Sequence, residues 1–157
     1  MSTLLNQINI IISSKLTDSV GLSDVSAVVA ETVSTALVEV DCDALYTVTE
    51  DITGTENALD LVGALTDPLG DVVQFAKVMA IFVRNNAVAN SMSIGGNANS
   101  LELCADKASD KITLAYGAYL LMVDKNGIPV TAGSTDILQI NGTAGDEYDI
   151  IVIGTAV

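Results

Sequence analysis

The segment YDIIVI at residues 148–153 and the longer segment VVQFAKVMAIFVR at residues 72–84 decide the fold of this chain. Both are rich in Val, Ile and Phe, and their apolar residues mostly follow one another instead of alternating with polar ones. Apolar runs of this length are typical of strands that are covered on both faces. We therefore expect residues 72–84 to form a buried strand and residues 148–153 to form a central strand.

Turn signals surround these two segments. Asp67-Pro68-Leu69-Gly70 has the residue preferences of a type I turn. Asn126-Gly127 predicts a type I′ hairpin turn, and Asn141-Gly142 predicts the end of another strand. Further strands are expected at residues 44–52, 111–116, 119–123 and 136–140, with a loop at Gly95-Gly96-Asn97. Closely spaced strands without intervening helices predict an all-β fold, a β-sandwich or jelly roll.

The N-terminal segment fits two structures. Val25, Val28, Val29 and Val33 follow helical spacing, with Ser23 as a possible N-cap. The same segment is dense in β-branched residues, which favour strands. We expect residues 1–34 to be an N-terminal arm or oligomerisation segment, and leave open whether the arm is partly helical. Residues 35–157 are expected to form the β-sandwich domain.

Composition excludes several kinds of function. The chain has no histidine, and six basic residues stand against twenty acidic ones for a net charge of −14. Without histidine there are no Ser-His or Cys-His nucleophiles, and the acidic balance argues against direct nucleic-acid binding. No secretory signal and no membrane-spanning segment are expected. The mean hydropathy of +0.50 is high, so we expect surplus apolar surface to be buried in a homo-oligomer.

No residue is assigned a catalytic, cofactor-binding or metal-binding role, and no cofactor is expected. Cys42 and Cys104 are predicted to be buried thiols. Asp124-Lys125-Asn126-Gly127 starts like a calcium loop, but Pro129 and Thr135 occupy the positions where such a loop needs glycine and glutamate. We interpret Asp41-Cys42-Asp43 as a solvated turn, and Asn141-Gly142-Thr143 as turn chemistry rather than a glycosylation site.

The part of the chain from Asp60 to the C-terminus resembles small virion structural proteins of tailed bacteriophages. The segments that carry the resemblance are Leu59–Gly63, Leu69–Val78, Ile81–Asn85, Val130–Asp136 and Tyr148–Gly154. The resemblance implies a β-sandwich or jelly-roll module in a virus particle. Small proteins of this kind often act as capsid decoration (cement) proteins, which bridge neighbouring subunits of the major capsid protein.

We accordingly expect a non-enzymatic virion protein, made in the host cytoplasm, that binds and stabilises the assembled head. Its expected partners are the major capsid protein and further copies of itself. The alternatives are a tail, neck or fibre component of the virion, and a carbohydrate- or receptor-binding β module. An aromatic content of only 4% argues against the last of these.

Overall fold

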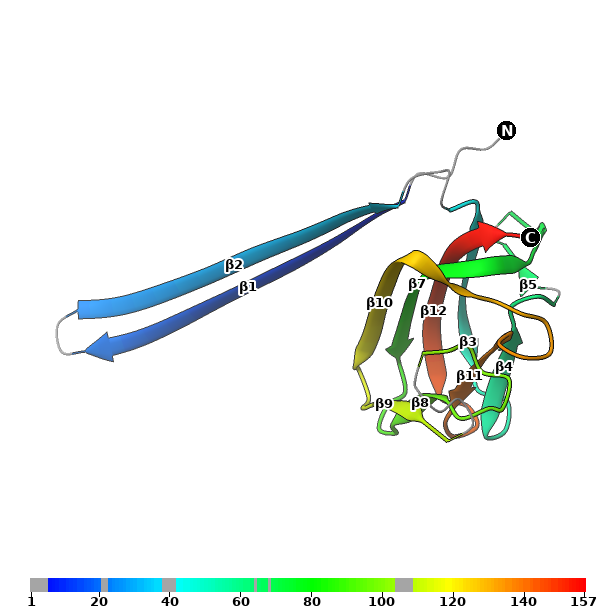
Figure 1. The fold of residues 1–157 in the computed structure, drawn as a ribbon. Coiled ribbons are helices and arrows are strands. Elements are labelled where there is room, and N and C mark those ends of the chain that lie inside the picture. The colour runs from blue at the N-terminus through cyan, green and yellow to red at the C-terminus, as the bar shows by residue number, and fades with distance from the viewer. Residues whose placement is uncertain (1–5, 21–22, 38–41, 64, 68, 104–108) are drawn as a thin grey trace. The chain divides into compact units, whose positions relative to one another are not determined.

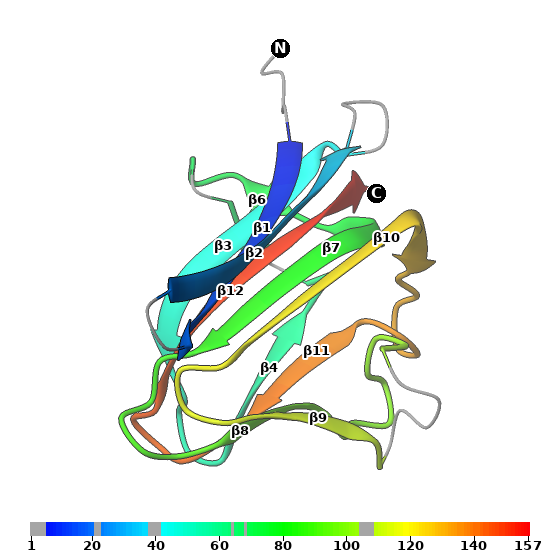
Figure 2. The same ribbon diagram turned by 90° about the vertical axis from the view of Figure 1, so that its left-hand side faces the viewer.

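The computed structural model describes the backbone of residues 6–20 and 23–37, and describes residues 42–63, 65–67, 69–103 and 109–157 in full. All regular elements in these ranges are β-strands, so the all-β prediction is confirmed. The chain divides into two compact units, Met1–Glu39 and Val40–Val157. Figure 1 labels strands of both units, and β6 is labelled in Figure 2.

The first unit is a long antiparallel hairpin of two strands. β1 (Asn6–Val20) and β2 (Ser23–Leu37) pair without a register shift, from Asn6 opposite Leu37 to Val20 opposite Ser23. The partly helical alternative for the arm is therefore wrong in these residues. The β-branched side chains that weaken a helix outweigh the helical spacing of the valines. The expected division after residue 34 falls within β2.

The second unit contains two four-stranded antiparallel sheets and a small two-stranded one. In spatial order, the strands of the first sheet, here called the β7–β12 sheet, are β10 (Tyr119–Pro129), β7 (Phe75–Asn85), β12 (Glu147–Ala156) and β3 (Ala44–Asp51). Those of the second, the β8–β11 sheet, are β4 (Glu56–Asp60), β11 (Ile137–Asn141), β8 (Met92–Gly95) and β9 (Lys111–Leu114). β5 (Leu65–Thr66) pairs with β6 (Val72–Val73). Figure 2 looks onto the β7–β12 sheet, with the β8–β11 sheet behind it.

Both apolar segments occupy the interior of the first sheet. β12 lies between β7 and β3, and β7 lies between β10 and β12, so the prediction of a central strand at residues 148–153 is confirmed. Ile81, Ile150 and Val152 are fully buried, and they share one hydrophobic cluster with Leu138 and Ile140 of the other sheet. The two sheets are thus held by a common core.

The turn predicted at residues 67–70 is present ahead of β6 and β7. The Gly70 N–H donates to the Asp67 carbonyl over 3.1 Å, which confirms a turn at residues 67–70, although Pro68 lies outside the described residues. The predicted strand at 72–84 is divided at Gln74 into β6 and β7. Gln74 belongs to neither strand, and its side-chain Nε2 donates to the carbonyl of Val62 over 2.6 Å.

The predicted hairpin turn at Asn126-Gly127 is wrong, because these residues lie within β10. The register against β7 shifts between Val123 and Ile128, which marks a β-bulge. A type I′ turn needs positive φ at both central residues. Gly127 meets this requirement with φ +73°, but Asn126 does not, because no non-glycine residue among those described has positive φ. The Asn126 N–H donates to Asp124 Oδ1 over 2.8 Å.

Gly117 transfers the chain from one sheet to the other. The strands predicted at residues 111–116 and 119–123 belong to different sheets, since β9 pairs with β8 and β10 pairs with β7. Gly117 has φ +71°, a conformation that glycine adopts without steric cost. Its N–H donates to the carbonyl of Asn85 at the end of β7 over 2.9 Å.

The buried Asn85 side chain joins this transfer point to the neighbouring strands. Asn85 is fully buried, and its Nδ2 donates to the carbonyls of Asn90 and Leu114 over 2.9 and 3.1 Å. Its Oδ1 accepts the N–H of Ala87 over 2.9 Å. One amide therefore fixes the end of β7, the approach to β8 and the end of β9.

We predict that Asn85→Ala lowers the free energy of unfolding by about 3 kcal/mol, because it leaves several buried backbone groups without partners. Urea denaturation measures the change. Asn126→Ala is the matched control, since it removes an exposed asparagine side chain and should cost much less. Equal effects of the two substitutions would contradict the assigned role of Asn85.

Candidate functional site

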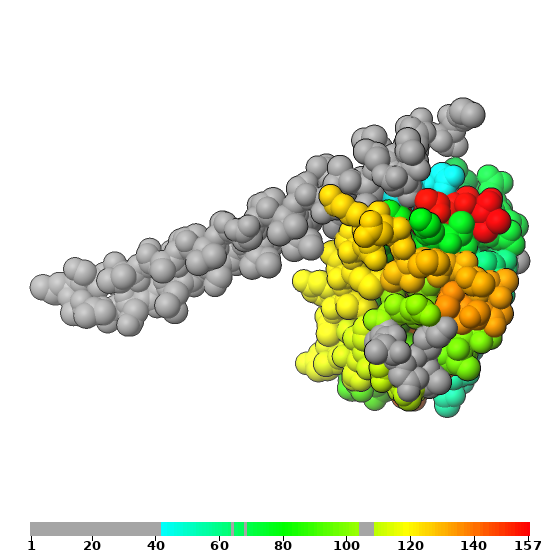
Figure 3. Space-filling view, in the orientation of Figure 1, coloured from blue at the N-terminus to red at the C-terminus, as the bar shows by residue number. Residues whose placement is uncertain are grey.

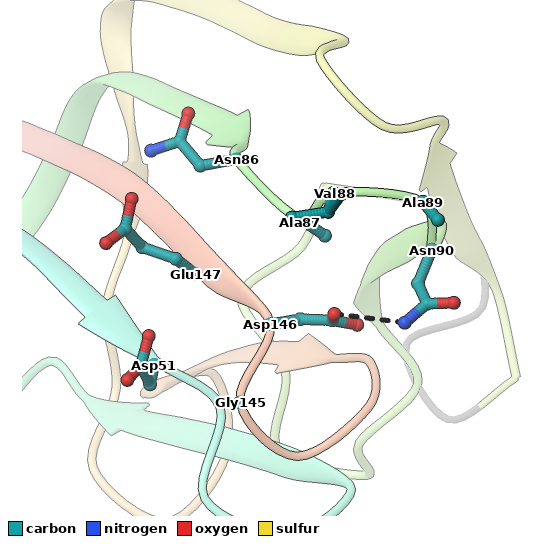
Figure 4. Close-up of a pocket in the computed structure, with 9 residues that line it drawn as sticks. All are labelled: Asp51, Asn86, Ala87, Val88, Ala89, Asn90, Gly145, Asp146 and Glu147. Carbon is teal, nitrogen blue, oxygen red and sulfur yellow. Dashed lines mark hydrogen bonds between the residues drawn. The ribbon is translucent and has the colours of Figure 1, made fainter.

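An open pocket of about 370 Å³ lies at one end of the second unit (Figure 4). It is formed where β3 ends, where β7 leads toward β8, and where the turn before β12 begins. Its lining residues are Asp51, Asn86, Ala87, Val88, Ala89, Asn90, Gly145, Asp146 and Glu147. These residues include no hydroxyl, thiol or cationic side chain. The pocket is therefore an acidic recess with little chemistry beyond its carboxylates and amides.

Two of the carboxylates face each other across a pair of strands. Asp51 of β3 lies directly opposite Glu147 of β12, and both side chains are exposed. Like charges at directly opposite positions destabilise a sheet. Their proximity gives the recess a concentrated negative charge.

The third carboxylate has a structural role. Asp146 is buried, and its Oδ1 accepts a hydrogen bond from Asn90 Nδ2 over 3.0 Å. Its Oδ2 accepts the N–H of Thr143 over 3.1 Å. Oδ2 thus closes the turn before β12, and Oδ1 holds this turn against the segment that leads into β8, as Figure 4 shows for Asn90.

A hydrogen-bond network around the buried Tyr148 hydroxyl joins β12 to β3 and β4. Tyr148 is fully buried, and its hydroxyl donates to Glu50 Oε2 over 3.0 Å while accepting from Asn57 Nδ2 over 3.2 Å. Burial raises the pKa of the Tyr148 phenol above its ordinary value of 10.0. Burial likewise raises the pKa of Tyr46, helped by the charge of Glu50. These phenols are core residues that favour the neutral form.

In the buried Asp136 carboxylate only one of the two oxygens has a hydrogen-bond partner. Asp136 precedes β11, and its Oδ2 accepts the N–H of Gly133 over 2.5 Å. Its Oδ1 is buried and has no hydrogen-bond partner. Among the residues that the structure describes, no three Cys, Asp or Glu side chains gather so that they could hold a metal ion.

The motifs weighed in the sequence lie apart from one another. Cys42 is buried, as predicted, whereas Cys104 and Asp41 lie outside the described residues. Asp43 Oδ1 accepts the N–H of Ala156 over 2.6 Å. Asn141, the last residue of β11, donates through Nδ2 to the carbonyls of Ser93 and Gly95 over 3.2 and 2.9 Å. These polar groups hold strand ends in place.

The recess was not foreseen from the sequence, because its acids come from distant positions. Asp51 and Glu147 meet only through the pairing of β3 with β12. A signal was available in part, since Asp146 and Glu147 flank the apolar segment at 148–153. Nothing in the sequence said that this flank lies opposite Asp51.

Comparison with known proteins gives no relative: no protein-family model, no curated protein and no solved structure matches the chain. Within the described residues, no helix could span a membrane.

We predict that Glu147→Gln raises the free energy of unfolding by up to about 1 kcal/mol, because it removes the repulsion with Asp51. The matched control is Asp71→Asn, which neutralises an exposed acid elsewhere in the same unit. Urea denaturation at low salt measures both variants. The assignment fails if the two substitutions stabilise the protein equally.

Alkaline pH should destabilise the protein through its buried phenols. The pKa of Tyr148 is higher in the folded state than in the unfolded one, so its stabilising contribution is complete below about pH 10 and declines as pH rises through the folded value. We predict that Tyr148→Phe costs about 1 kcal/mol at pH 7 and makes the decline above pH 10 less steep. Tyr119→Phe, at an exposed tyrosine, should leave the decline unchanged. Thermal unfolding as a function of pH distinguishes the two.

Proposed function

We infer that the second unit is an eight-stranded jelly roll. Such a fold arises when a long antiparallel ribbon of eight strands rolls up into two sheets. If the eight strands are counted in chain order, ribbon pairing joins the first to the eighth, the second to the seventh, the third to the sixth and the fourth to the fifth. The observed pairs β3–β12, β4–β11, β7–β10 and β8–β9 match this rule.

The two remaining pairings support the same inference. β12 pairs with β7 and β11 pairs with β8, which are the contacts that form when the ribbon rolls up and places its first segment beside its third and its second segment beside its fourth. The strand orders β10-β7-β12-β3 and β4-β11-β8-β9 follow directly. Jelly rolls occur in viral capsid proteins, in lectins and in cupins, so the fold alone leaves the function open.

We propose that the chain is a non-enzymatic virion structural protein, a capsid decoration (cement) protein that binds and stabilises the assembled head. The observation that carries the proposal is the hairpin unit Met1–Glu39. A two-stranded sheet is at best marginally stable in water and becomes stable when a third strand or a second layer covers it. An arm of this kind fits a protein whose ordered state is reached by packing on a neighbour.

The proposed mechanism is non-covalent. A protein that binds the assembled head, but not the free subunits, stabilises the head by mass action. Many symmetry-related copies make the total stabilisation large even when each contact is weak. The proposed partners are the major capsid protein and other copies of this chain, and the proposed location is the virion. The net charge of −14 suits a protein that remains soluble while it displays apolar surface.

A carbohydrate-binding module is the second candidate. Tyr116 and Tyr119 lie near each other in sequence and are each 65% exposed, and Tyr119 stacks on Phe82 with ring centroids 6.0 Å apart. Exposed aromatic rings are the groups that bind sugar faces in such modules. A glycan array with the full chain tests this candidate, and binding that is lost in Tyr119→Ala would favour it over the virion role.

We predict that particles lacking this protein lose infectivity at lower temperature, or after milder osmotic shock, than complete particles. Adding back the purified full chain should restore resistance, whereas a variant lacking residues 1–39 should not. Circular dichroism of that variant checks that the second unit, with its own core, stays folded. Particles that are equally resistant with and without the protein would contradict the proposed function.

A further inference from the structure

The outer face of the β7–β12 sheet is apolar although its inner face already packs on the core. Side chains alternate between the two faces of a strand, and the core cluster takes Ile81, Val83, Ile150 and Val152. The residues between them point to the other face, which Figure 2 shows toward the viewer. We call this surface the outer β7–β12 face and define it by Leu45, Phe82, Leu121, Val123, Ile151 and Ile153.

The strand register arranges this face in rows that cross all four strands. In the first row Val123, Ala80, Ile153 and Leu45 are successive partners, and all are apolar. In the second row Leu121, Phe82 and Ile151 are successive partners, and the exposed, polar Thr47 of β3 ends the row. Directly opposite side chains within a row lie about 5 Å apart, and diagonal neighbours in adjacent rows lie about 7 Å apart. The two rows therefore form one continuous patch. Phe82, Leu121 and Ile151 of the second row are all partly exposed, as are Leu45 and Val123 at the two ends of the first row, whereas Ala80 and Ile153 between them are buried.

The other sheet shows the usual pattern and serves as an internal comparison. Across the outer face of the β8–β11 sheet, Thr113, Ser93, Asn141 and Glu56 are successive partners, and all are polar. Antiparallel sheets commonly have one face on the core and one polar face in water. The apolar outer face is therefore a property of the β7–β12 sheet alone, and a patch of this kind marks a protein contact surface.

The charges beside the patch indicate what covers it. In the third row Arg84 of β7 lies directly opposite Asp149 of β12, and Asp149 Oδ1 accepts a hydrogen bond from the Thr49 hydroxyl of the same chain over 2.7 Å. The row thus carries one positive and one negative charge, in a chain with a net charge of −14. Two copies that approached through acidic surface would repel each other, but here Arg84 of one copy can face Asp149 of the other. The third row is therefore complementary to itself, whereas the exposed acids Glu147 and Asp51 lie one row further along the same face, outside the proposed contact.

We propose that a second copy of this chain packs on the outer β7–β12 face, sheet against sheet, about a two-fold axis. Face-to-face sheets pack about 10 Å apart with their strands about 30° from parallel. In a two-fold contact each residue meets its counterpart reciprocally, so Phe82 and Ile151 pack at the centre while Arg84 and Asp149 pair at the margin. β10 forms one border of the second unit in the view of Figure 3, at the edge of this contact.

The inference rests on the self-association that belongs to the proposed function, and it specifies the surface. The two can fail separately. Self-association is measured on the purified chain in solution, whereas the virion role is measured on particles. If the chain dimerises but is absent from particles, the proposed interface stands and the proposed function fails. If the chain is monomeric but present in particles, the proposed function stands and the proposed interface fails.

Sedimentation velocity of the full chain over a hundredfold range of concentration tests the proposal. The wild-type chain should self-associate, and Phe82→Lys should raise the dissociation constant at least about tenfold because it buries an unpaired charge. Ala58→Lys is the matched control, since it places the same charge on the exposed outer face of the other sheet. Thermal unfolding verifies that both variants are folded.

Exchange of the two marginal charges tests the pairing independently, and it decides the matter if Phe82→Lys does not fold. Arg84→Asp and Asp149→Arg should each weaken association about tenfold, and the double variant should restore it to within about threefold of wild type. A wild-type chain that is monomeric throughout, a Phe82→Lys variant that associates normally, or a double variant without rescue would each overturn the proposal. A monomer that binds another virion protein through this face would do so as well.

Discussion

The fold depends on the position of the last strand. β12 lies between β3 and β7, so the sheet cannot close until the C-terminal segment has been added. Its residues Tyr148, Ile150 and Val152 are fully buried and join the core that both sheets share. The contacts that β12 makes thus link residues far apart in the chain, as when Tyr148 pairs with Asn85 and Gly154 pairs with Ala44. Loss of this strand would leave β3 without its partner and expose the apolar faces of β7.

Strong local patterns made part of the fold predictable. The continuous apolar runs identified β7 and β12 as interior strands, because such runs need cover on both faces. The same runs also predicted apolar residues on the outer face of the β7–β12 sheet. The structure shows that the β8–β11 sheet covers the inner face of that sheet and not the outer one. The short strands β4 and β8 were missed, since four or five residues give too little alternation to identify a strand.

The errors arose where tertiary structure outweighed local chemistry. Asn126-Gly127 forms a bulge because β7 continues beside it and supplies partners on both sides of the irregularity. Gly117 ends one sheet and begins the other because the Asn85 side chain donates to the carbonyl of Leu114, while the Asn85 backbone bonds Gly117 and Ala118. The acidic recess could not be foreseen, because Asp51 and Glu147 meet only through strand pairing. The strand order, which supports the jelly-roll inference, likewise has no local sequence signal.

These features suit a protein that works by contact. The hairpin arm and the apolar outer face of the β7–β12 sheet are the two surfaces on which the proposed contacts rest, and the net charge of −14 is compatible with the proposed role. The copy number of this chain in purified virus particles, measured by densitometry against the major capsid protein, tests the proposed function most directly. A ratio near one, or a simple fraction of one, is predicted for a decoration protein of the head. A few copies per particle would assign the chain to the tail or neck, and its absence would contradict the virion role altogether.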